Sequence, residues 1–544
     1  MRFNPIISDT LCALARGVFC TFYLDDGARA ELCFIAILSA KTLCPKIMKF
    51  LKSLLFICLA PALALAQTSP NIQEFDNYVQ QAVADWHVPG LAIAVVKDSK
   101  VIFAKGYGVR ELGKPDKVDA QTIFAIASTT KAMTAACAAM LVDEGKLHWD
   151  DKVTDYLPGF QLYDPYVTRE LTVRDLFLHD SGVGNTDYLW AFMNIPADDM
   201  LRRLRLVKPE YGFRAGFVYQ NIFYVTAGKV IEKASGMPWE DFVQKRIFTP
   251  LKMMRSVPAF SKSKAILNQS SAHIKVDSSI VVAQKDVTDA IGPAGGVWSS
   301  VEDMAKWISC MLDSTKYNGG QRLLKPESWA MLLKPQTFVS EGEFYPTARI
   351  TKPHWITYGL GWFQQDYQGQ KVDFHTGSLT GLVAINGMIV DKKVGVYILA
   401  NLDHAELRHA LMFKAFDYFA LGGNRDWSKE FLKLYGEILA KRQKATKEYE
   451  TKRVMDTHPT LDIKAYAGTY TDPLYGTVVI TAVADKLTFN INSFITAEAT
   501  CWNYDTFVGP YARKEYGKIG ATFNIDELGK VSTVNVDGML FARQ

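Results

Sequence analysis

Ser128 and Lys131 have the residue types and the spacing of a nucleophile and its base. On a helix, a separation of three residues turns two side chains only about 60° apart and about 4.5 Å along the axis, so their tips can touch. A serine hydroxyl reacts only when a base removes its proton, and lysine acts as that base where burial lowers its pKa. The mostly apolar segments 125–127 and 132–136 predict that burial.

The Ser-x-x-Lys spacing is a weak signal by itself. Ser261 and Lys264 repeat it in a polar stretch, where a capping serine and a surface lysine explain the pattern. Two further motifs follow Ser128 in order. Tyr219-Gln220-Asn221 is the one Tyr-x-Asn in the sequence, and His375-Thr376-Gly377-Ser378 precedes two strand-like runs. The ordered set predicts a single site.

Tyr219 and His375 each have a structural interpretation beside the functional one. Tyr219 would be an ordinary half-buried aromatic residue, and His375 would order a strand. As a functional residue, Tyr219 would lie near a buried ammonium, which lowers the pKa of a phenol towards a range useful for acid–base work. His179-Asp180-Ser181 is not interpreted as a triad, because triads assemble from distant segments.

The three motifs resemble those of the class C β-lactamases and the related D,D-carboxypeptidases, D-aminopeptidases and esterases. The middle motif is of the Tyr-x-Asn kind that marks this branch. Segments 171–182, 247–253 and 293–296 also look alike, so the resemblance covers about residues 71–422.

The resemblance implies a role for each motif residue. Ser128 would be acylated, Lys131 would accept its proton and Tyr219 would shuttle a proton to the leaving group. The substrate-binding residues would be Asn221, His375, Thr376, Gly377 and Ser378. The backbone N–H groups of Ser128 and Ser378 would form the oxyanion hole.

His375 departs from the penicillin-recognising members, which carry lysine at this position. A lysine is a permanent cation for a substrate carboxylate, whereas histidine is mostly neutral at pH 7. The departure favours peptidase or esterase activity over efficient β-lactam turnover.

Composition limits the partners. The 544 residues include 61 basic and 57 acidic side chains without a dense basic stripe, which excludes an electrostatic footprint for nucleic acid. The histidines lack metal-ligand spacing and there is no Cys-x-x-Cys, so we expect no metal and no cofactor. The expected partner is a small-molecule or peptide substrate, and the oligomeric state is left open.

Residues 48–66 read as a signal peptide, with a basic start, an apolar run at 54–65 and cleavage after Ala66. The run is too short to span a bilayer, so we expect no stable membrane span after cleavage and a periplasmic or secreted protein. Ile57 before Cys58 fits a lipoprotein site poorly. Residues 1–47 are interpreted as an over-extended start, with a genuine amino-terminal extension as the alternative.

The predicted fold is α+β: an antiparallel sheet flanked by helices, plus a small carboxy-terminal antiparallel β-barrel. Strands are expected at 91–96, 101–104, 383–390 and 394–399, and helices at 128–144, 218–234 and 301–312. The catalytic domain would span 67–424 and a helical linker 425–457, with a solvated surface helix of the main domain as the alternative for the charged segment 425–455. Short alternating strands at 458–544 predict a barrel or a sandwich, which resembles a lipocalin-like domain.

These observations predict an exported serine hydrolase that acts through an acyl-enzyme on amide or ester bonds of small peptides or peptidoglycan-like substrates. A carboxylesterase or a weak β-lactamase is the nearest alternative. Two others are a non-catalytic peptidoglycan-binding or sensing protein and a structural module in which the late β-domain docks a partner.

Overall fold

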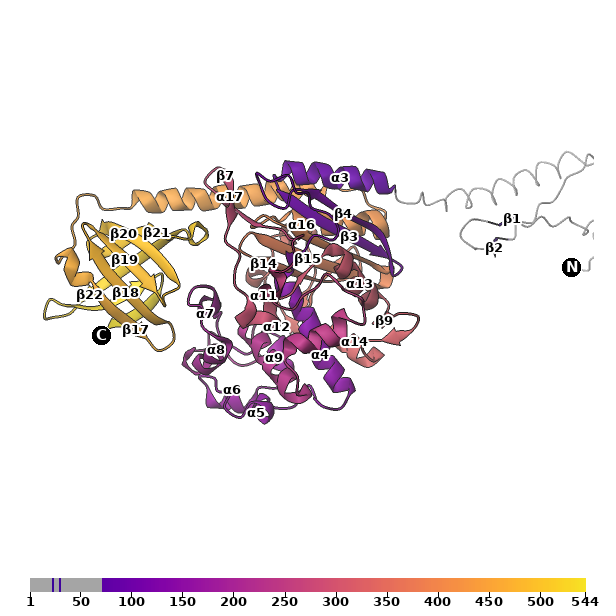
Figure 1. Ribbon diagram of the computed structural model, residues 1–544, viewed down its shortest axis with the longest axis horizontal. Helices are drawn as coiled ribbons and strands as arrows, with labels where there is room; N and C mark the ends of the chain where they lie inside the picture. Colours follow the sequence, from indigo (N-terminus) through magenta and orange to yellow (C-terminus); the bar gives the residue numbers. More distant parts are fainter. Residues whose placement is uncertain (1–21, 24–28, 31–70) are drawn as a thin grey trace, which may run out of the picture. The chain divides into compact units, whose positions relative to one another are not determined.

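The computed structural model describes residues 22–23, 29–30 and 71–544 (Figure 1). In the amino-terminal unit, β1 (Phe22–Tyr23) pairs antiparallel with β2 (Arg29–Ala30). The predicted signal peptide, its cleavage point and most of residues 1–47 lie outside the described residues. Residues 72–544 form the second unit, which contains the three motifs that begin at Ser128, Tyr219 and His375.

An eight-stranded sheet forms the centre of this unit, in the order β11-β12-β13-β14-β15-β16-β3-β4. Every neighbouring pair is antiparallel, which confirms the predicted sheet type. The strands are β3 (Gly90–Lys97), β4 (Lys100–Gly108), β11 (Thr337–Phe338), β12 (Ile356–Tyr358), β13 (Phe363–Tyr367), β14 (Gln370–Leu379), β15 (Leu382–Ile389) and β16 (Val394–Ala400).

Both faces of the sheet are covered, as β3 shows. Because successive side chains point to opposite faces, Ala92 and Ala94 join one core cluster while Leu91 and Ile93 join the other. The first cluster includes side chains of α4 (Thr130–Asp143), α9 (Ile222–Ser235) and α13 (Val301–Leu312). The second includes those of α3 (Ile72–Asp85) and α16 (Leu407–Phe416). Figure 1 shows the strands between these two helical layers.

Helix α4 follows the 3₁₀ turn η2 (Ala127–Thr129) and is buried on all sides over most of its length. Its alanine-rich sequence explains this position, since small side chains let neighbouring elements approach closely. Helix α9 and the short α12 (Gly292–Gly295) both pack against it. Helix α4 ends near Gly145, whose positive φ of 69° suits a left-handed cap.

A long helix, α17 (Trp427–Thr451), leads to a closed eight-stranded barrel in which β17 pairs with β24. Alternation along the strands turns apolar side chains such as Val478 and Ile480 inward. Sequence analysis predicted either a barrel or a sandwich for the carboxy-terminal segment, and the structure confirms the barrel. Its strands are β17 (Gly468–Asp472), β18 (Gly476–Val483), β19 (Lys486–Ile491), β20 (Ile495–Asn503), β21 (Thr506–Pro510), β22 (Lys518–Ile525), β23 (Val531–Val536) and β24 (Met539–Arg543).

Shorter elements complete the described chain, and the domain boundaries given above stay predictions. The remaining α-helices are α5 (Val153–Tyr156), α6 (Pro165–Glu170), α7 (Tyr188–Ala191), α8 (Ala197–Arg203), α10 (Trp239–Val243), α11 (Phe260–Ser263), α14 (Pro326–Leu332) and α15 (Ala348–Thr351). The remaining strands are β5 (Phe124–Ala125), β6 (Ala272–Val276), β7 (Ser279–Ala283), β8 (Trp298–Ser299), β9 (Lys316–Tyr317) and β10 (Gln321–Arg322). Within the described residues, no helix combines the length and the apolar character needed to cross a bilayer.

Candidate active site

The structure brings Ser128 and Lys131 into contact at the start of α4. Ser128 lies in η2 and is half-buried, while Lys131 is fully buried one turn later. The Lys131 Nζ lies 3.1 Å from the Ser128 Oγ. It also donates to the Asn221 Oδ1 at 2.6 Å and to the Ala294 carbonyl at 3.0 Å.

These three partners orient the amine. Asn221 Oδ1 and the Ala294 carbonyl can only accept, so they keep two N–H groups of Lys131 in either protonation state. When the third proton leaves, the lone pair therefore faces the Ser128 hydroxyl. Burial lowers the pKa of Lys131 to about 7, and the negative charge of Asp187 opposes this shift. A neutral amine is thus accessible at physiological pH, which is what a base requires.

Asn221 links the lysine to a carboxylate that sequence analysis missed. Its Nδ2 donates to both carboxylate oxygens of Asp187, at 2.8 and 2.9 Å. Trp190 Nε1 donates to the same carboxylate at 3.1 Å. Asp187 lies in a loop just before α7. Asp187 belongs to no periodic pattern in the sequence. The only sequence signal for a role in the site is its position between the Ser128 and Tyr219 motifs.

Tyr219 lies beside the pair, with the Lys131 Nζ 4.8 Å from the centroid of its ring. Its hydroxyl is buried and has no hydrogen-bond partner among the described residues. Burial raises the pKa of Tyr219 well above its usual value, and the neighbouring Ser128 hydroxyl opposes this rise. The expected lowering of this pKa was therefore wrong, because removal of the phenol from water, the largest effect on it, raises the pKa. The phenol is protonated at neutral pH.

Tyr219 precedes α9 instead of lying within it, so the helix predicted from residue 218 begins four residues too early. The reason is a hydrogen-bonded loop. The Val218 N–H donates to the His179 carbonyl and the Gln220 N–H donates to the His179 Nδ1, at 3.0 Å each. The His179 ring lies 4.4 Å from that of Tyr219, between centroids. His179 thus supports Tyr219, a contact that sequence analysis did not foresee.

His375 is held by protein groups on both ring nitrogens. Nδ1 lies 2.6 Å from the Thr376 carbonyl, which can only accept, so Nδ1 carries the proton and Nε2 accepts from the Tyr358 hydroxyl at 2.8 Å. Burial lowers the pKa of His375 to about 3, and the charge of Lys131 contributes. The ring is 1% exposed. The structure does not bring it to the pocket surface, where direct substrate binding would require it.

Thr376 and Ser378 of the third motif line the pocket. Thr376 Oγ1 lies 2.5 Å from the Tyr345 hydroxyl, and the exposed Ser378 accepts from Arg408 at 2.9 Å. Arg408 also donates to the Gly377 carbonyl at 2.6 Å. Sequence analysis missed Tyr345 and Arg408, which come from segments outside the three motifs.

A pocket of about 410 Å³ opens over these groups. It is lined by Ser128, Asp187, Trp190, Tyr219, Asn221, Gly342, Glu343, Phe344, Tyr345, Pro346, Phe363, Thr376, Ser378 and Arg408. The predicted nucleophile, the phenol and the amide thus share one cavity with Thr376 and Ser378 of the third motif, whereas Gly377 and His375 do not line it. Among the described residues, no group of three or more His, Cys, Asp or Glu side chains could hold a metal ion.

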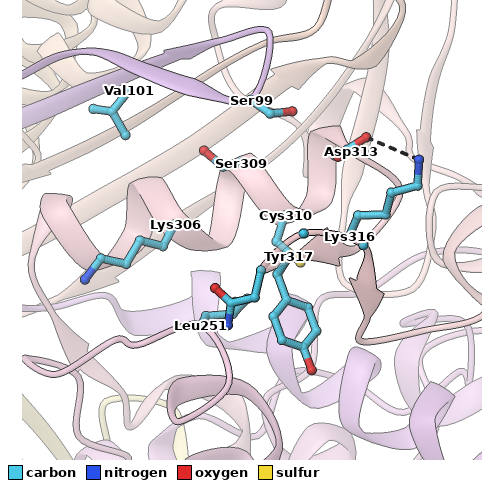
Figure 2. Close-up of a pocket in the computed structure, with 12 residues that line it drawn as sticks. Ser99, Val101, Leu251, Lys306, Ser309, Cys310, Asp313, Lys316 and Tyr317 are labelled. Atoms are coloured by element: carbon cyan, nitrogen blue, oxygen red, sulfur yellow. Dashed lines mark ion pairs between the residues drawn. The ribbon is translucent and has the colours of Figure 1, made fainter.

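A second hollow, of about 480 Å³, lies over α13 and lacks this chemistry (Figure 2). Lys316 and Asp313 form an ion pair there at 3.9 Å. Burial raises the pKa of the Cys310 thiol to about 12, so it is a poor nucleophile.

Comparison with known proteins agrees with this geometry. The sequence pattern of the family described as Beta-lactamase matches residues 75–416. The chain belongs to the beta-lactamase family. Members of the beta-lactamase family are typically serine hydrolases. A second family, described as Domain of unknown function (DUF3471), matches residues 452–543.

One curated relative extends beyond the beta-lactamase region. The Unguisins hydrolase ungD of Aspergillus violaceofuscus is 28% identical over 451 residues, which cover 77% of this chain and 78% of the relative.

Solved structures of other beta-lactamase-fold proteins share the architecture. The octameric penicillin-binding protein homologue from Pyrococcus abyssi has a TM-score of 0.57 and 23% identity, covering 87% of this chain and 100% of that one. A D-stereospecific amidohydrolase from Streptomyces sp. has a TM-score of 0.51 and 22% identity, covering 64% and 99%. At these identities the likeness establishes the fold.

Proposed function

We propose that this protein is an exported serine hydrolase that cleaves amide or ester bonds of small peptides, including D-residue or peptidoglycan-like substrates, through an acyl-enzyme on Ser128. The observation that carries the proposal is the 3.1 Å contact between a buried Lys131, whose pKa is about 7, and the Oγ of Ser128, which lines a pocket of about 410 Å³.

In the acylation step, Ser128 Oγ attacks the carbonyl carbon while its proton moves to the lone pair of Lys131. The carbonyl π electrons move to oxygen, and the backbone N–H groups of Ser128 and Ser378 bind this oxyanion. The amide of Asn221, fixed by Lys131 and Asp187, orients the substrate.

The raised pKa of Tyr219 defines its part in the next step. A free phenolate is costly in this buried position, so Tyr219 gives its proton to the leaving nitrogen or oxygen while it takes one from Lys131. The carbon–leaving-group bond breaks and Lys131 is neutral again. Water then attacks the ester in the same way and releases the acid and Ser128.

The choice of substrate rests on the relatives and on the neutral His375. One relative is named a hydrolase of unguisins, and a protein of the same fold is named a D-stereospecific amidohydrolase. A neutral, buried His375 lacks the permanent charge that a substrate carboxylate needs. The leader-like residues 48–66 support export.

Intact-mass spectrometry after treatment with a fluorophosphonate tests the acyl-enzyme. We expect one covalent adduct, which Ser128→Ala abolishes together with p-nitrophenyl acetate hydrolysis. Ser261→Ala is the matched control, because Ser261 has the same spacing to a lysine but is exposed. Hydrolysis that survives Ser128→Ala, or an adduct that persists in it, would disprove the proposal.

A further inference from the structure

The carboxylate of Asp187, which lines the pocket, has hydrogen-bond acceptor capacity that the described residues do not fill. Its Oδ1 accepts from Asn221 and Trp190, whereas its Oδ2 accepts from Asn221 alone among the described residues. A carboxylate has room for about four hydrogen bonds, two on each oxygen. Asp187 lines the same pocket as Ser128, so a molecule bound there can supply the fourth donor to this carboxylate.

The cations near the pocket are already neutralised or enclosed. The Arg408 side chain is 4% exposed, pairs with Glu406 at 3.3 Å and donates to Gly377, Ser378 and Ala384. Lys131 is fully buried, with each of its donors engaged. Among the pocket-lining residues, the charges left accessible are therefore the carboxylates of Asp187 and Glu343.

We propose that Asp187 binds an ammonium group of the substrate, so that the enzyme selects peptides and amides with a free amino terminus. An ammonium supplies the donor that Oδ2 lacks and the positive charge that the pocket lacks, whereas a substrate carboxylate meets like charge. A charge-assisted hydrogen bond is also stronger than a neutral one. This inference rests on the proposed function and names its substrate class.

The contact also explains why a carboxylate lies so near the base. Asp187 reaches Lys131 through Asn221, and its negative charge favours the protonated, inactive lysine. A substrate ammonium at Asp187 offsets that charge when the base is needed. A substrate whose amino group is acylated carries no ammonium, so it leaves the negative charge of Asp187 uncompensated.

The kinetic test compares D-alanine p-nitroanilide with N-acetyl-D-alanine p-nitroanilide at pH 6.5, where a free α-amino group is protonated. We expect wild-type kcat/KM to be about 10- to 100-fold higher for the free amine, the range given by a hydrogen bond to a charged group. Asp187→Asn, which keeps an acceptor for Asn221, should remove this preference by lowering kcat/KM much more for the free amine than for the N-acetyl substrate. Glu341→Gln removes an exposed carboxylate outside the pocket and should change neither rate.

Two outcomes overturn the subsite. One is a wild-type enzyme without preference for the free amine. The other is an Asp187→Asn enzyme in which both rates fall equally, which would mean that Asp187 only orients Asn221.

A binding experiment separates this inference from the proposed function. Calorimetric titration of Ser128→Ala with D-alaninamide and N-acetyl-D-alaninamide needs no turnover. We expect binding at least about tenfold tighter for the free amine, lost in Ser128→Ala/Asp187→Asn. Ser128-dependent hydrolysis without this preference would overturn the subsite alone. Ammonium-selective binding without Ser128-dependent hydrolysis would overturn the proposed function and leave the subsite standing.

Discussion

Gly377 in β14 lies directly against the carbonyl of Ile126, where a Cβ added at position 377 would be 2.2 Å from the oxygen. Glycine is therefore the residue that lets β14 approach η2. Ala127, between Ile126 and the nucleophile, has a positive φ of 47°, a conformation that the surrounding packing must hold. The close approach fixes Ser128 beside Ser378.

Replacing Gly377 should damage the site more than the fold. In Gly377→Ala, the backbone of β14 or η2 must shift, which moves the two predicted oxyanion donors apart. We expect kcat/KM for p-nitrophenyl acetate to fall by about 100-fold, the cost of one lost oxyanion donor. Gly436→Ala is the control, since its Cβ meets open space within α17 and alanine favours a helix. Unchanged activity in Gly377→Ala would contradict the tight approach.

Activity should rise with pH through the titration of Lys131. The base must be neutral to accept the Ser128 proton, and the pKa of Lys131 is about 7. Activity should therefore be maximal at pH values well above 7 and should be lost as the pH falls below about 7. Rates of p-nitrophenyl acetate hydrolysis between pH 5 and 9 measure this limb. Lys131→Arg should be inactive throughout, because guanidinium stays protonated. Lys264→Arg, at the exposed copy of the spacing, should match wild type.

Asp187→Asn should move this limb to lower pH for a substrate without an ammonium group. The negative charge of Asp187 raises the pKa of Lys131 against the effect of burial, so its removal lowers that pKa further. The pH profile with N-acetyl-D-alanine p-nitroanilide gives the measurement, and Glu341→Gln supplies the comparison. A limb that stays in place, or moves to higher pH, would show that Lys131 does not sense this carboxylate.

The barrel should support the segment that carries Asp187. The Tyr188 ring lies 5.0 Å from that of Tyr475, and the Tyr516 hydroxyl donates to the Ala191 carbonyl at 3.1 Å. An aromatic pair contributes about 1 kcal/mol. Tyr475→Ala should therefore raise KM about two- to tenfold for substrates with a free amino terminus, with a smaller change in kcat. Tyr504→Ala, an exposed ring of the same barrel, is the control. Equal KM values for both variants would assign the barrel no role at Asp187.

The sequence was most informative where chemistry depends on local geometry. Ser128 and Lys131 touch because three residues on a helix bring side chains together in almost any fold. The alternation in β3 and in the barrel strands likewise follows from the period of an extended chain. The apolar surroundings of Lys131 indicated its burial, and with it the direction of its pKa shift.

The tertiary structure alone decided the residues that come from distant segments. Asp187, His179 and Arg408 reach the site through loops and helices with no shared spacing, so no local pattern could connect them. The direction of the Tyr219 pKa shift and the enclosure of His375 depend on how much water is excluded, a property of the packed core. The spacing of residues along the chain thus determined which side chains could react with each other. Packing of the folded chain determined their protonation states and the groups that surround them.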